Sequence, residues 1–161
     1  MISRVTRVVI GVLAWAMVSS ELAGAQLLEY DEIVSNIEGR WAVPFEEDGA
    51  EILDCNRLFI SIQINNEDDQ PVFRSRQINV ESGEQHASRS DLRQAKGDSG
   101  QFIPAALIRY DNEERTTEDG NLLQWRLYMF SPDAFAWQAT HWGWSGWTAT
   151  RTRCEDDPST S

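Results

Sequence analysis

The feature that most restricts the fold of this chain is a set of short segments in which every second side chain is apolar. Residues 58–64 read LFISIQI, and residues 122–130 read LLQWRLYMF. Such alternation is typical of a β-strand with one buried face. Further strands are expected near Trp41 and Ile52 and over residues 71–80, 102–110, 135–142 and 147–154. The seven or eight strands predict an all-β antiparallel meander, which hides its edges by closing into a barrel or forming a sandwich.

Three segments depart from this pattern. Residues 27–38 have apolar side chains at helical spacing and precede Gly39, which predicts a short N-terminal helix. Residues 82–100 have almost no apolar content, and a long mobile loop with at most one helical turn at 91–96 is expected there. Pro104 near the start of the 102–110 strand indicates a sheet edge or a bulge, because proline cannot donate a ladder hydrogen bond.

The first 25 residues have the features of an export signal. Arg4 and Arg7 precede an apolar run at 8–18, and the small residues Ala23, Gly24 and Ala25 suit cleavage after Ala25. An uncleaved anchor, the alternative, would need a longer apolar stretch. We therefore expect a periplasmic or secreted protein with one domain over 26–154 and a frayed tail over 155–161.

The net charge of the chain limits the classes of partner that it can bind. The net charge of −12 becomes −13 once residues 1–25 are removed, and the single lysine is Lys96. Phosphate contacts require lysine and arginine, so nucleic acid and anionic membranes are poor partners. No membrane insertion is expected after removal of the signal.

The chain has two cysteines, Cys55 and Cys154. In an exported protein this count predicts one disulfide, and a loop of about 100 residues would contribute up to roughly 4–5 kcal/mol in the chain-entropy account. A catalytic thiol, the alternative, would require a nearby base, and the histidines are His86 and His141.

A helix followed by Gly39-Arg40-Trp41 and a β-meander resembles the lipocalins and their wider relatives, the calycins. The resemblance implies an up-and-down barrel of about seven or eight strands. It also implies that Trp41 plugs the closed end beneath an arginine of the last strand, either Arg151 or Arg153, of which we favour Arg151. A smaller calycin branch, the periplasmic inhibitors of secreted metalloproteases, is similar in size and compartment.

The segment HWGWSGW, residues 141–147, lies in the last predicted hairpin. A four-residue loop over 143–146 would pair Trp142 with Trp147 and Gln138 with Arg151. The same register would pair Phe135 with Cys154 and Trp137 with Thr152 on the core face, and a one-residue slip would reverse the faces. The rim tryptophans, Trp144 included, are interpreted either as a cross-strand aromatic clasp or as an exposed patch for a glycan, lipid or partner.

The sequence lacks the common motifs of catalytic sites. The sequence contains no glycine-rich phosphate loop, Gly-x-Ser-x-Gly elbow or His-Glu-x-x-His motif, and two scattered histidines argue against a metal site. Acidic runs such as Glu46-Glu47-Asp48 lack the spacing of a Ca²⁺ loop. We therefore expect no enzyme, no cofactor and no metal.

The prediction is a non-catalytic protein that holds a small apolar or amphipathic ligand in the barrel mouth. The expected ligand-binding residues are Trp125, Trp137, Leu123, Leu127, Trp142 and Trp147, with Ile60 and Ile62 as further lining or core candidates. A barrel of this size can also be filled by its own side chains, which would leave no cavity. The alternative function is a protein-binding module, such as a periplasmic protease inhibitor, that uses the loops and the 142–147 aromatics.

Overall fold

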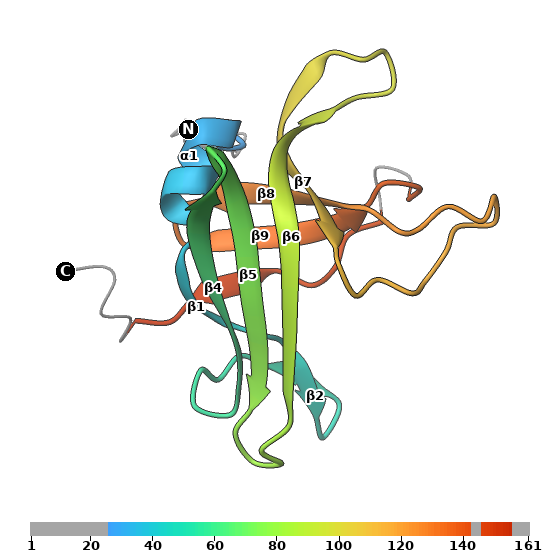
Figure 1. Cartoon of the computed structure of the whole chain (residues 1–161). Helices are drawn as coiled ribbons and strands as arrows, with labels where there is room; N and C mark the ends of the chain where they lie inside the picture. Colours follow the sequence, from blue (N-terminus) through green and yellow to red (C-terminus); the bar gives the residue numbers. More distant parts are fainter. Residues whose placement is uncertain (1–25, 143–145, 156–161) are drawn as a thin grey trace, which may run out of the picture.

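The computed structural model describes residues 26–142 and 146–155, so the predicted signal, most of the predicted tail and Trp144 lie outside the described residues. The described elements are α1 (Tyr30–Asn36), β1 (Gly39–Ala42), β2 (Phe45–Glu47), β3 (Ala50–Ile52), β4 (Leu58–Glu67), β5 (Gln70–Asn79), β6 (Gln85–Lys96), β7 (Phe102–Tyr110), β8 (Trp125–Ser131), β9 (Ala134–Ala139) and β10 (Arg151–Arg153). Eight strands close into an antiparallel up-and-down barrel in the order β1-β10-β9-β8-β7-β6-β5-β4, with β2 and β3 as a separate hairpin (Figure 1). The all-β barrel prediction is confirmed.

The alternating segments form strands whose apolar face points into the barrel. Ile60 and Ile62 of β4 and Trp125 and Leu127 of β8 belong to one buried core cluster. Pro104 lies where the β6–β7 register shifts, between the pairs Gln94↔Ala106 and Lys96↔Phe102. The predicted bulge is therefore confirmed.

The predicted mobile loop over residues 82–100 is wrong, because most of it is β6, a strand of 12 residues. This strand is hydrogen-bonded to β5 on one side and to β7 on the other. Both neighbours therefore satisfy the backbone hydrogen bonds of β6. Few apolar side chains are needed, because one face of the strand is open to solvent and the inner face carries small polar residues such as Ser88 and Ser90.

Aromatic side chains fill the barrel along its length. Trp41 packs edge-on against Phe135 with ring centroids 4.8 Å apart, and Phe135 packs in the same way against Trp137 at 5.3 Å. The Trp137 ring in turn packs against the rings of Phe73 and Tyr110, with centroids 5.8 and 6.2 Å apart. Edge-to-face pairs at these distances are favourable beyond the area that they bury. Side chains consequently fill most of the barrel interior.

The helix α1 covers one end of the barrel and is shorter than the predicted 27–38. A capping box begins it, in which Glu32 accepts a hydrogen bond from the Glu29 backbone N–H. Ile33 and Ile37 are fully buried, and the indole Nε1 of Trp41 donates to the Ile37 carbonyl at 2.9 Å. The helix and Trp41 together close this end.

The arginine above Trp41 is Arg153, with its guanidinium carbon 4.2 Å from the ring centroid. The choice of Arg151 is therefore wrong, whereas the stacked arginine implied by the calycin resemblance is present. Arg153 is the β10 residue directly opposite Trp41, and opposed residues share a face of the sheet. Its guanidinium also donates to the carbonyls of Asn36 and Glu38, near the end of α1.

Cys55 and Cys154 form the predicted disulfide, with a Cα–Cα distance of 5.9 Å. Both thiols are used in this bridge, so neither is a catalytic nucleophile. The bridge joins the segment before β4 to the residue after β10, and the Cys154 backbone N–H donates to the Arg40 carbonyl. It therefore fastens the seam where the barrel closes.

The predicted register of the last hairpin is wrong. Arg151 pairs with Phe135 instead of Gln138, and Thr152 pairs with Ala134 instead of Trp137. Because β9 ends at Ala139 and β10 begins at Arg151, the connection is far longer than a four-residue turn. The shift of three residues reverses the face of β10 and turns Arg151 toward the interior, although Phe135 and Trp137 remain in the predicted core.

Candidate functional site

A polar hollow opens at the barrel mouth, beside the loop that connects β7 to β8. In Figure 1 this loop projects on the side away from α1. The hollow has a cavity volume of about 410 Å³. Its lining comes from the inner faces of β4 to β7 and from the start of the loop: Ile60, Ser75, Gln77, His86, Ser88, Tyr110, Asn112, Glu113, Glu114 and Arg115.

The strand register explains why the hollow exists. Gln77 stands opposite both Ile60 and His86, and Ser75 stands opposite Ser88. These inner-face positions carry short or polar side chains, whereas the inner face nearer α1 carries aromatic side chains. The aromatic filling therefore stops at Tyr110, and the space above it remains open.

Tyr110 forms the aromatic floor of the hollow. Its ring packs against Phe73 and Trp137 with centroids 6.4 and 6.2 Å apart, which fixes its orientation. Burial raises the pKa of its phenol, so the hydroxyl is protonated at neutral pH and can donate a hydrogen bond. Among the described residues the hydroxyl has no hydrogen-bond partner.

An ion pair fixes the rim. The Glu113 carboxylate accepts hydrogen bonds from Arg115 Nε at 2.7 Å and Nη2 at 2.8 Å, and from Trp125 Nε1 at 3.1 Å. The hydrogen bond from Arg115 is the main cause that lowers the pKa of Glu113 to about 2. The Arg115 guanidinium also lies 5.2 Å from the Trp125 ring centroid. The charges of Glu113 and Arg115 balance each other, so this ion pair adds no net charge to the rim.

Trp142 extends this rim as an aromatic surface. Its ring meets Trp125 edge-on with centroids 5.5 Å apart, and 36% of the residue is exposed. Trp147 instead packs against Tyr128 at 4.8 Å and Phe130 at 5.9 Å, on the outer side of β8. The predicted pairing of Trp142 with Trp147 is wrong, because the long connection places the two rings on different parts of the barrel.

None of the six predicted ligand-binding residues lines the hollow. Leu123, Leu127 and Trp137 are buried in the packed core, Trp125 and Trp142 lie together at the rim, and Trp147 is outside. Of the wider candidates, Ile62 is also in the core and Ile60 lines the hollow. The prediction missed Ser75, Gln77, Ser88 and Tyr110. Alternation from Phe73 could have placed Ser75 and Gln77 on the inner face.

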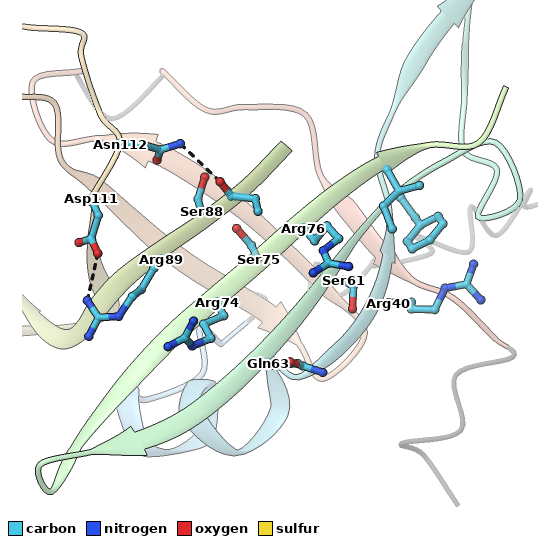
Figure 2. Close-up of a pocket in the computed structure, with 13 residues that line it drawn as sticks. Arg40, Ser61, Gln63, Arg74, Ser75, Arg76, Ser88, Arg89, Asp111 and Asn112 are labelled. Atoms are coloured by element: carbon cyan, nitrogen blue, oxygen red, sulfur yellow. Dashed lines mark hydrogen bonds and ion pairs between the residues drawn. The ribbon is translucent and has the colours of Figure 1, made fainter. Parts of the chain in front are cut away.

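A second hollow lies on the outer face of β1, β4, β5 and β6, and we call it the arginine groove. Its volume is about 640 Å³, and its lining includes Arg40, Arg74, Arg76 and Arg89 (Figure 2). Ser75, Ser88 and Asn112 line both hollows, which therefore share a wall.

The described residues contain no group of three or more histidine, cysteine or acidic side chains that could hold a metal ion. His86 lies 2.9 Å from Glu84 at the mouth and is mostly exposed. No helix in the described part of the chain is long and apolar enough to cross a membrane.

Comparison of the chain with protein-family models, with curated proteins and with solved structures found no match.

Proposed function

We propose that this protein is an exported, non-catalytic binding protein that holds a small amphipathic ligand at the barrel mouth. The observation that carries the proposal is the polar hollow above Tyr110, whose hydroxyl has no partner among the described residues. A volume of about 410 Å³ falls within the range of small-molecule sites, roughly 300–1,000 Å³. The disulfide supports export, because such bonds persist in oxidising compartments.

The chemistry of the mouth favours an amphipathic ligand over a purely apolar one. Ser75, Gln77 and Ser88 offer hydrogen-bonding groups, and an apolar ligand would leave these groups without partners. Trp142, which is partly exposed and packs against the buried Trp125, provides an apolar surface beside the rim. A ligand with a neutral hydrogen-bonding group, set deep, and an apolar body against the tryptophans satisfies both surfaces.

The test is native mass spectrometry of protein purified from its own compartment, compared with the Tyr110→Phe variant. We expect a co-purifying small molecule whose retention falls about five- to tenfold in Tyr110→Phe, as befits one lost hydrogen bond. Tyr30→Phe is the matched control, because the Tyr30 hydroxyl donates to the Leu92 carbonyl outside the mouth. Empty protein from its native compartment, with a captured protein instead, would support the alternative of a protein-binding module.

A further inference from the structure

The arginine groove has an ordered arrangement that results from the strand register. Three rows cross the outer face of the sheet, and each is separated from the next by two residues along the strands. The first row holds Phe59 and Ile78, and the second holds Arg40, Ser61 and Arg76. The third row holds Gln63, Arg74 and Arg89. One end of the groove is thus apolar, and the rest is basic.

The basic rows are unusual in a chain with a net charge of −12. Arg74 and Arg89 stand directly opposite each other, an unfavourable pair unless a carboxylate lies between them. Glu67 supplies it, with one oxygen 2.7 Å from Arg74 and the other 2.9 Å from Arg89. Asp111 lies 3.0 Å from Arg89 on its other side. The third row is therefore largely neutralised and held in place.

The second row contains one arginine, Arg76, that has no acidic neighbour among the described residues. Arg76 is exposed, and it has no hydrogen bond or ion pair with any other described residue. Arg40 extends across the Phe59 ring, with its guanidinium carbon 4.2 Å from the ring centroid. Figure 2 shows the two arginines projecting on either side of Ser61. A guanidinium can bind a carboxylate through two parallel hydrogen bonds, so this row suits an acidic side chain.

We propose that the arginine groove binds an extended acidic peptide segment of another protein. The rows are about 6.4–6.8 Å apart, since two residues of a strand rise that far. Side chains on one side of an extended peptide repeat at the same distance. A peptide that runs along β4 and β5 places an apolar side chain on Phe59 and Ile78 and an acidic one, two residues on, at Arg76.

The shape and charge of the groove favour a peptide over other occupants. The groove runs along the outer face of β1, β4, β5 and β6, where an extended segment has room to lie parallel to the strands. The acidic character of the whole chain disfavours a long polyanion, while the local arginines attract a short acidic segment. Ser61 and Gln63 line the groove beside the arginines and can hydrogen-bond a peptide backbone.

The test is calorimetric titration of the full chain with the capped peptide Gly-Leu-Ser-Asp-Ser-Asp-Gly. Arg76→Gln should weaken binding about tenfold, because a charge-assisted hydrogen-bonded pair is lost. Arg93→Gln is the matched control: Arg93 is 70% exposed on β6 but outside the groove, so its loss should leave affinity within twofold. Near-ultraviolet circular dichroism confirms that both variants are folded.

Further measurements distinguish the peptide from other occupants. A peptide with asparagine in place of both aspartates should bind at least tenfold more weakly, and one with the leucine moved to the far end should also lose affinity. Equal affinity of the asparagine peptide, or of Arg76→Gln, would overturn the proposal. Complete displacement by millimolar inorganic phosphate would reduce the groove to a small-anion site. Self-association of the free chain that is lost in Arg76→Gln would instead identify a second copy as the occupant.

Discussion

The mouth and the arginine groove are built on opposite faces of the same three strands. Along β5, Ser75 and Gln77 line the mouth, while their neighbours Arg74 and Arg76 line the groove. Inside, Ser75 and Gln77 are neutral, Glu113 is paired with Arg115, and Arg151 donates hydrogen bonds to Thr148 Oγ1 and the Ala149 carbonyl. Outside, water stabilises the charges, and Arg76 persists without a partner among the described residues. One strand thus contributes to the lining of two chemically different hollows through the alternation of its side chains.

Loss of the disulfide should weaken both hollows together. The seam is short, since β10 has three residues and makes two register pairs with β1 and two with β9. With a sequence separation of 99 between the two cysteines, replacement of both by serine should cost about 4–5 kcal/mol of unfolding free energy. Urea denaturation measures this loss. Unchanged stability would mean that the seam holds without the bridge.

Acid should affect the rim of the mouth more than the groove. The pKa of Glu113 is about 2 against 4.5 for an unperturbed glutamate, so its stabilising contribution is complete above about pH 4.5 and is lost as the pH falls toward 2. The contribution is roughly 3 kcal/mol. Glu113→Gln should be less stable than the parent at pH 6 and closer to it at pH 3, by urea denaturation. Glu114→Gln is the control, and an equal loss there would contradict the assignment to Glu113.

Substitution of the two described tryptophans between β9 and β10, Trp142 and Trp147, should affect unfolding free energy and ligand retention differently. Trp147→Ala removes packing against Tyr128 and Phe130 and should cost about 2 kcal/mol without changing ligand retention. Trp142→Ala should cost about 1 kcal/mol or less, because the ring is partly exposed, but it should lower ligand retention at the mouth. Thermal unfolding and native mass spectrometry give the two quantities. The reverse pattern would move the ligand to the outer side of β8.

The smallest effect should come from Glu67→Gln in the groove. Hydrogen bonds from Arg74 and Arg89 lower the pKa of this carboxyl, but the group is exposed to solvent and its ion pairs are screened. We expect a slight fall in thermal stability that disappears in 1 M salt. Affinity for the acidic peptide should rise, because Arg74 and Arg89 are released from their shared carboxylate. A fall in affinity would mean that Glu67 positions these arginines for binding.

The sequence predicted correctly those features of the fold that are visible within the sequence of a single strand. The alternation in β4 and β8 placed Ile60, Ile62 and Leu127 correctly, because the period of two is visible within each strand. The pattern failed for β6, whose stability comes from hydrogen bonds to β5 and β7 instead of from apolar side chains. It also failed for the last hairpin, because the length of the 140–150 connection leaves no trace in the strands that it joins.

The two hollows were harder to predict because each depends on pairing between strands. Ser75 and Ser88 are 13 positions apart in the chain, and only the β5–β6 register places them side by side. Arg74 and Arg89 come together through the same register, and Glu67 joins them through the turn before β5. A list of arginines in an acidic sequence gives no sign that four of them line one groove.

The disulfide also determines the fate of a chain that has been cut. The exposed loop between β7 and β8, residues 111–124, lies between Cys55 and Cys154 in sequence. A protease that cleaves this loop therefore leaves two fragments joined through sulfur, and they separate only after reduction. In a compartment rich in proteases, the nicked protein would keep its full mass and its closed seam.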